Sequence, residues 1–203
     1  MEILPCAGGL LPLRSGLRIY CITAMDREDH RSLLQKGVTS TGGTWADFGS
    51  GTGAFTAALA GLLGGTGRIF SVDTDARALR EQGRVIREAF PLLHLELVRA
   101  DYTKLSDMPP LDGAVAANSL HYQRDLVGAL RLILTWLKPG AGLVVVEYDV
   151  RSASPWIPFP LPPARLEEAS AAAGYAEAKL LAARPSAYNR RVYSMFCRKT
   201  GRA

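Results

Sequence analysis

The sequence predicts an α/β protein with a mostly parallel sheet and helices on both faces of that sheet. Three observations predict it. Short apolar, β-branched runs alternate with helical segments of about 10 to 15 residues, the pattern of strand–helix–strand crossovers. A glycine-rich turn at 49–53 joins one such strand to the next helix. The length of 203 residues and the hydrophobic content of 48% suit one domain with a sizeable core.

The first half of the chain predicts three helices and three strands. Asp26 caps a helix that ends at Gly37, and the glycines at 64 and 65 end the helix that follows the glycine-rich turn. The third helix is amphipathic. The predicted helices span 26–36, 54–63 and 76–89, and the predicted strands span 44–48, 68–73 and 93–100.

The second half predicts the same alternation, followed by a change of pattern. Strands are expected at 111–118 and 141–150, with a helix at 124–137 that Pro139 and Gly140 end. A proline- and aromatic-rich stretch at 154–163 is unsuited to a central strand. A helix at 164–173 then precedes two strands, 176–184 and 190–199, which predict a terminal hairpin.

Residues 1–25 are predicted to be an N-terminal extension, and residues 26–203 a single domain. The apolar stretch near the start carries Glu2, lacks a positive beginning and is interrupted by glycine and proline, so it does not resemble a signal peptide. No run of about 18 apolar residues occurs, so no membrane-spanning segment is expected. Three scattered cysteines predict neither a disulfide framework nor a zinc site, and they favour a cytoplasmic location.

The net charge of +5 permits an anionic partner, but the arginines form no dense block typical of nucleic-acid binding. The three histidines are far apart and predict no metal site. Charge therefore leaves nucleic-acid binding as a minor alternative.

The segment Asp47-Phe48-Gly49-Ser50-Gly51-Thr52-Gly53 carries the strongest functional signal. Glycines at a strand–helix turn permit positive φ angles and let a ligand approach the backbone closely. A dinucleotide site remains possible on spacing alone, because Ala54 can stand where its fingerprint has a third glycine. Asp47 favours another ligand, since a carboxylate there would repel a pyrophosphate but could hold an ammonium group.

Residues 44–149 resemble the class I S-adenosylmethionine-dependent methyltransferases, through this turn and through the strand ending in Val72-Asp73. The resemblance implies a Rossmann-like seven-stranded sheet of order 3-2-1-4-5-7-6, with residues 176–199 as its antiparallel end. It implies S-adenosyl-L-methionine as cofactor, with the acid and glycines of the turn around the methionine part. Those residues are Asp47, Gly49, Ser50, Gly51 and Gly53.

The resemblance also implies roles for residues at the next three strand ends. Asp73, with Thr74, corresponds to the family's acid for the ribose hydroxyls, although an aspartate before a helix can also be an N-cap, as Asp75 is expected to be. Asp101, with Tyr102, corresponds to the acid for the adenine amino group, or is an ordinary loop aspartate. Asn118 is expected beside the methionine carboxylate and the acceptor.

For the acceptor, His121 is a candidate catalytic base because imidazole exchanges protons near neutral pH. It can equally cap a helix or fill a pocket wall. Candidate walls for an apolar acceptor are residues 20–25 and four aromatic side chains, Tyr122, Tyr148, Trp156 and Phe159. The alternative for the loop is that Trp156, Ile157 and Phe159 pack as core. No inserted recognition domain is evident, which favours a small-molecule acceptor and leaves RNA or protein open.

Three functions therefore remain. The first is a methyltransferase. The second is an NAD(P)-dependent reductase, against which Asp47 and the terminal hairpin argue. The third is a protein that binds S-adenosylmethionine without catalysis, as a regulator or partner. Whether the chain forms oligomers is not predicted.

Overall fold

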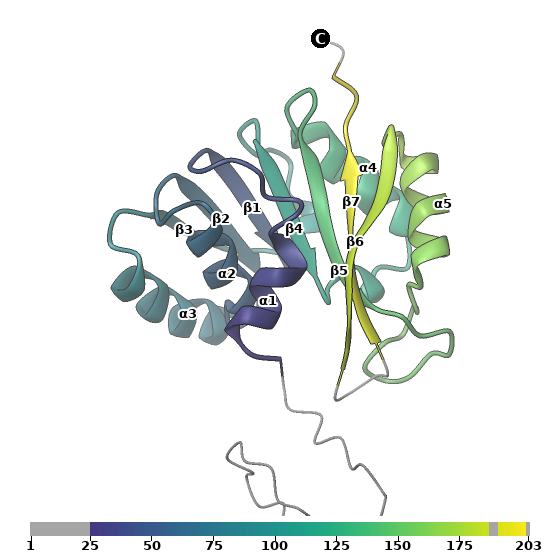
Figure 1. The fold of residues 1–203 in the computed structure, drawn as a ribbon, viewed down its shortest axis with the longest axis horizontal. Coiled ribbons are helices and arrows are strands. Elements are labelled where there is room, and N and C mark those ends of the chain that lie inside the picture. The colour runs from purple at the N-terminus through teal and green to yellow at the C-terminus, as the bar shows by residue number, and fades with distance from the viewer. Residues whose placement is uncertain (1–24, 187–190, 202–203) are drawn as a thin grey trace, which may run out of the picture.

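A twisted seven-stranded sheet runs through the molecule in the order β3-β2-β1-β4-β5-β7-β6 (Figure 1). The computed structural model describes residues 25–186 and 191–201. β1 to β5 are parallel, whereas β7 runs antiparallel to both β5 and β6. The strands are β1 (Thr44–Phe48), β2 (Arg68–Asp73), β3 (His94–Arg99), β4 (Gly113–Ala117), β5 (Gly142–Tyr148), β6 (Glu177–Pro185) and β7 (Arg191–Arg198). The predicted sheet order and antiparallel hairpin are confirmed.

Helices cover both faces of the sheet, as predicted (Figure 1). α1 (Arg27–Leu34), α2 (Ala54–Leu62) and α3 (Ala76–Ala89) lie on one face, and α4 (Leu126–Trp136) and α5 (Pro163–Ala173) on the other. Two short 3-10 helices, η1 (Tyr102–Lys104) and η2 (Leu120–Tyr122), follow β3 and β4. None of the helices in the described part of the chain is long and apolar enough to span a bilayer.

Local sequence explains where most helices begin. Asp26 forms a capping box with Asp29 at α1, and Asp75 and Asp125 accept backbone N–H bonds at the starts of α3 and α4. The expectation that Asp75 is a cap is therefore confirmed. The helix predicted over 124–137 is shorter at both ends, because Asp125 is its N-cap rather than part of its first turn and Leu137 has an extended backbone conformation.

The core divides into two layers because side chains alternate along each strand. In β1, Trp45 packs toward α1, α2 and α3, whereas Ala46 and Phe48 pack toward α4 and α5. The central strand β4 is buried along its whole length. Asp47 shares the α2 side of β1, where Thr56 of α2 contacts it. The parallel strands thus end together at one edge, where ligands of open α/β sheets bind.

Candidate functional site

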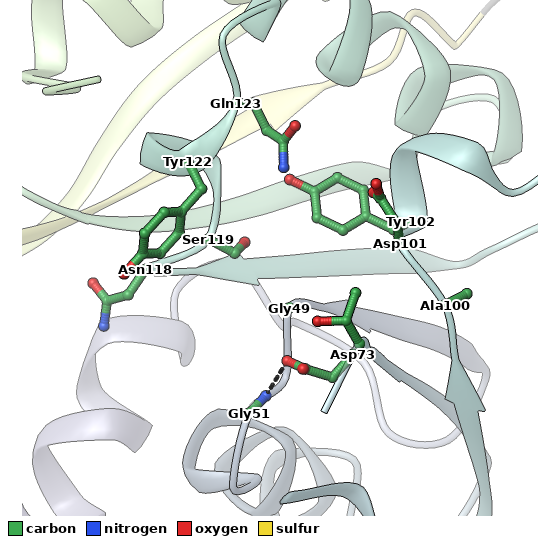
Figure 2. A pocket seen from close by; sticks show the side chains of 11 residues that line it. Gly49, Gly51, Asp73, Ala100, Asp101, Tyr102, Asn118, Ser119, Tyr122 and Gln123 are labelled. Atoms are coloured by element: carbon green, nitrogen blue, oxygen red, sulfur yellow. Dashed lines mark hydrogen bonds between the residues drawn. The ribbon is translucent and has the colours of Figure 1, made fainter. Parts of the chain in front are cut away.

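The carboxyl ends of β1 to β4 surround a pocket of about 470 Å³. This volume lies within the range of roughly 300–1,000 Å³ typical of small-molecule sites. Asn118 and Tyr122 lie on one side of it, and Asp101 and Tyr102 on the other (Figure 2). We call it the first pocket. Most of the predicted cofactor residues line it, namely Gly49, Gly51, Asp73, Thr74, Asp101, Tyr102 and Asn118.

The glycine-rich turn presents backbone to this pocket for two different reasons. Gly49 has a φ of +77°, and a side chain there would meet the Cβ atom of Ser119 at 2.4 Å. Gly51 has a φ of +53°, and no atom lies within 4 Å of where its Cβ would stand. Gly49 is therefore required by packing, whereas Gly51 leaves open space on the pocket wall that a side chain would fill.

Asp73, at the end of β2, fixes the turn and faces the pocket. Its Oδ2 accepts from the backbone N–H of Gly51 at 2.8 Å (Figure 2), and its Oδ1 accepts from the backbone N–H of Asp75 at 2.8 Å. An ionised carboxylate has about four acceptor positions, so both oxygens can still accept a hydroxyl hydrogen bond. Asp73 is therefore both part of the loop structure and a candidate hydroxyl ligand.

Asp47 lies behind the turn rather than on the pocket wall. Its side chain is fully buried, its Oδ2 accepts from Thr56 Oγ1 at 2.6 Å, and its Oδ1 has no hydrogen-bond partner. Burial is the main cause that raises the pKa of Asp47 to about 7, with a smaller contribution from the charge of Asp73. A buried acceptor without a donor is costly, and this missing hydrogen bond adds to the cost of ionising the Asp47 carboxyl group.

A buried network behind the turn was missed by sequence reasoning. Ser50 Oγ lies 2.7 Å from Ser71 Oγ, and Gln82 Nε2 donates to Ser50 Oγ at 3.0 Å and to the carbonyl of Gly51 at 2.9 Å. Ser50 and Gly53 therefore face α3 and do not line the pocket. The available signal was Gln82 itself, a polar residue among Leu79, Gly83 and Ile86 on the buried face of α3.

Asp101 and Tyr102 close the other side of the pocket. Asp101 Oδ1 accepts from Thr103 N at 3.0 Å and Thr103 Oγ1 at 2.7 Å, and the hydroxyl contact holds the pKa of Asp101 below its ordinary value. Asp101 thus caps η1 and lines the pocket at once. The Tyr102 ring packs on Phe48 with centroids 5.5 Å apart, which makes it part of the core as well as of the wall.

Asn118, just after β4, has a backbone conformation that residues other than glycine rarely adopt. Its φ is +52°, the one positive φ at a non-glycine residue in the described part of the chain. Asparagine tolerates this left-handed region better than most residues, and such strain often accompanies functional sites. Its Oδ1 is buried without a partner. Asn118 also lines a second pocket of about 660 Å³, so it stands at the junction of the two.

The second pocket contains His121 and most of the predicted aromatic walls. Seven residues line it, namely Asn118, His121, Tyr122, Tyr148, Ser154, Trp156 and Ile157. Trp156 is 79% exposed, which agrees with a pocket wall, whereas Ile157 is 3% exposed and packs as core. Phe159 is half-buried, does not line the pocket and donates its backbone N–H to the His121 carbonyl at 3.0 Å. Residues 20–24 lie outside the described residues.

Glu147 of β5 is the second functional candidate that sequence reasoning missed. It is 1% exposed, and its Oε2 lies 2.6 Å from His121 Nδ1 while its Oε1 accepts from the His121 backbone N–H at 3.1 Å. A charged residue inside an apolar strand needs a buried partner. That was the available signal, and His121 is that partner.

The comparisons with known proteins agree with this geometry. Residues 46–140 match the family model described as a methyltransferase domain. Over 130 residues, the chain is 28% identical to a probable cobalt-precorrin-6B C(15)-methyltransferase (decarboxylating) of Thermoplasma volcanium. That alignment covers 63% of this chain and 63% of the relative, so less than two thirds of the relative's length is matched.

Several solved structures share the fold at low sequence identity. The YcgJ protein of Bacillus subtilis has a TM-score of 0.68 at 11% identity, covering 85% of this chain and 99% of its own. An S-adenosylmethionine-dependent methyltransferase of Aquifex aeolicus has a TM-score of 0.62 at 15% identity, covering 86% and 98%. The (4+2)-cyclase SpnF has a TM-score of 0.68 at 18% identity, covering 86% and 80%.

The sheet order, the glycine-rich turn and the acids at successive strand ends define a Rossmann-like methyltransferase fold. Residues 46–140 also match the methyltransferase-domain model, so the chain is similar in fold and in this central segment to the class I S-adenosylmethionine-dependent methyltransferases. SpnF shows that the same fold also occurs in a protein described by a different reaction.

The residues of the first pocket fit the cofactor that this family implies. Asn118 Oδ1 is a buried oxygen without a donor at the pocket wall and suits an ammonium group, and the open face of Gly51 suits close approach. The remaining acceptor positions of Asp73 suit vicinal hydroxyls. No group of three or more His, Cys, Asp or Glu in the described part of the chain is placed to hold a metal ion.

Proposed function

We propose that this protein is a methyltransferase that binds S-adenosyl-L-methionine in the first pocket and methylates a small molecule. The observation that supports it best is the pairing of Gly51 and Asp73. The Asp73 carboxylate receives the Gly51 N–H at 2.8 Å and still has acceptor capacity toward the pocket. One residue therefore shapes the turn and can bind the ribose.

In this proposal, different residues of the first pocket bind the three parts of the cofactor. Asp73 and Thr74 hold the ribose, Asp101 accepts the adenine amino group, and the glycine-rich turn with Asn118 receives the methionine moiety. Bound in this way, the cofactor supplies a methyl group already activated as a sulfonium. The protein contributes positioning and exclusion of water, and positioning alone can supply about 7–11 kcal/mol.

The test is isothermal titration with S-adenosylmethionine, S-adenosylhomocysteine and NADPH in parallel. We expect the two sulfur compounds to bind and NADPH not to bind. Asp73→Ala removes a charged acceptor, worth about 1.5–3 kcal/mol per hydrogen bond, so affinity falls roughly 10- to 100-fold or more. Asp75→Asn is the matched control, because this neighbouring acid caps α3 and does not line the pocket.

Normal cofactor affinity in Asp73→Ala would show that the site is assigned wrongly. Binding of S-adenosylmethionine without any methylated product, across a broad panel of small acceptors, would instead favour the non-catalytic binding protein. Binding of NADPH alone would favour the reductase.

A further inference from the structure

We propose that the second pocket takes a flat, uncharged acceptor bearing a phenol-type hydroxyl, and that Glu147 positions His121 to receive the proton of that hydroxyl. This inference rests on the proposed function, because the first pocket must hold the methyl donor. Its own evidence is the lining of the second pocket, the loop that carries Trp156 and the buried His121–Glu147 pair.

The lining favours a neutral, planar ligand. Three aromatic side chains, Tyr122, Tyr148 and Trp156, contribute to the wall, and no Lys, Arg, Asp or Glu lines it among the described residues. A charged ligand would lose its hydration there without gaining an opposite charge. Aromatic rings offer apolar faces on which a flat ligand can stack. The shared residues Asn118 and Tyr122 bring this pocket directly against the first one.

The exposure of the aromatic residues supports a ligand at this place. Five large apolar side chains are exposed in the described part of the chain, and the two aromatic ones, Tyr122 at 52% and Trp156 at 79%, both line this pocket. The Trp156 loop is held firmly, since Ser154 and Ile157 pair with each other through two backbone hydrogen bonds of 3.1 Å and Ile157 is buried. Trp156 is thus displayed by an anchored turn.

His121 is placed as a base by contacts that leave one ring nitrogen for a ligand. Its Nδ1 lies 2.6 Å from Glu147 Oε2, and a carboxylate there requires Nδ1 to carry the proton. In the neutral imidazole, Nε2 then bears the lone pair. The ring packs on Tyr122 with centroids 4.3 Å apart and is 2% exposed, so only a group inside the pocket reaches it.

In the proposed reaction, proton transfer to His121 accompanies methyl transfer to the acceptor oxygen. His121 Nε2 takes the proton as the O–H bond of the acceptor breaks, and the oxygen keeps the electron pair to form its new bond to the methyl carbon. The sulfonium donor supplies that carbon, and the pair of the broken carbon–sulfur bond stays on sulfur. Phenolic hydroxyls have ordinary pKa values near 10, as in tyrosine, so they give up a proton to imidazole more readily than aliphatic alcohols.

The binding test uses 2-naphthol as probe, titrated into protein saturated with S-adenosylhomocysteine. Two analogues of the same ring system, 2-naphthoate and 2-naphthylmethylammonium, report on charge. We expect 2-naphthol to bind at least tenfold more tightly than either. Trp156→Ala should weaken it roughly 3- to 10-fold, the effect of losing one aromatic contact. Leu92→Ala is the control, because Leu92 is equally exposed at 79% and lines neither pocket.

The positioning test uses Glu147→Gln, which keeps the shape of the side chain and removes its charge. Nitrogen-15 NMR of the imidazole should show His121 protonated at Nδ1 in the wild type and a mixture of both tautomers in Glu147→Gln. With a phenolic acceptor, kcat should fall at least tenfold with little change in KM. Glu96→Gln is the matched control, since Glu96 lies 3.5 Å from His94 Nδ1 on β3, away from both pockets.

Each outcome has a clear meaning. Tighter binding of either charged analogue, or binding of 2-naphthol that Trp156→Ala leaves unchanged, overturns the acceptor class. An unchanged His121 tautomer and an unchanged kcat in Glu147→Gln overturn the positioning role. Both results leave the proposed function intact if S-adenosylhomocysteine still binds. Failure of S-adenosylhomocysteine to bind overturns the proposed function and this inference together.

Discussion

At the scale of single residues, Asp47 makes the free protein sensitive to pH. It is fully buried, one of its oxygens lacks a donor, and its pKa is raised from 3.8 to about 7. At a pH between these two pKa values, the Asp47 carboxyl group is deprotonated in the unfolded chain and protonated in the folded protein. The folded state therefore loses stability as pH rises through this window, and the full penalty persists above about pH 7.

Asp47→Asn should remove this dependence. The variant keeps an acceptor for Thr56 and has no proton to lose, so its unfolding free energy relative to wild type should rise by up to about 4 kcal/mol between pH 4 and pH 8. Urea unfolding of both proteins across that range measures the difference between their unfolding free energies at each pH. Titrating groups that the two proteins share contribute equally to both and cancel in this difference. A difference that does not change with pH would contradict the assignment of a raised pKa to Asp47.

At the scale of elements, α3 holds the glycine-rich turn through one polar side chain. Gln82 reaches from the buried face of the helix to Ser50 Oγ and to the carbonyl of Gly51, at 3.0 and 2.9 Å. Asp73 of β2 holds the same turn from the other side, through the Gly51 N–H. The peptide groups around Gly51 are thus fixed before any ligand arrives, which lowers the entropy that binding must overcome.

Gln82→Leu should loosen this turn. The substitution leaves the Gly51 carbonyl without its donor, and an unsatisfied buried group costs about 1–3 kcal/mol of unfolding free energy. We also expect weaker binding of S-adenosylhomocysteine, because the turn is no longer fixed. Glu81→Leu, on the exposed face of the same helix, should change stability by less than about 0.5 kcal/mol. Equal stability and equal affinity in the two variants would refute the role of Gln82.

The adjacent strands β4 and β5 position the side chains of the second pocket, as α3 and β2 position the glycine-rich turn at the first. β4 ends in the strained Asn118 and leads into η2, which carries His121, while β5 brings Glu147 underneath. The pair is 26 residues apart in sequence and meets because β4 and β5 are parallel neighbours. Parallel pairing therefore assembles both pockets at one edge of the sheet.

At the scale of the whole molecule, a ligand in the first pocket contacts four strand ends at once and should stabilise the complete sheet. A ligand present at 100 times its Kd adds about 2.7 kcal/mol. For a protein of this size, Tm should rise by roughly 5–10 °C with S-adenosylhomocysteine. Differential scanning fluorimetry tests this, with Asp73→Ala as the variant whose Tm should rise less at the same ligand concentration, because its affinity is lower. A ligand-independent Tm in wild type, or an equal rise in Asp73→Ala, would argue against the first pocket.

Much of the fold was predictable because its signals are local. The β1 and β2 bounds, 44–48 and 68–73, and the α3 bounds, 76–89, agree with the structure, since apolar periodicity and cap residues act within a few positions of the chain. The glycine-rich turn was equally visible, because positive φ angles require glycine locally. The order of the last two strands followed from the family resemblance rather than from such signals.

Local sequence signals located most of the elements, the turn at 49–53 and the polar residues at the strand ends. Which side chains meet depends on the tertiary structure. It turned Ser50 toward Gln82, buried Asp47 behind the pocket and placed Glu147 beneath His121. The physical reason is that propensity and capping depend on chain neighbours, whereas these contacts depend on strand register and on which face of the sheet each side chain occupies.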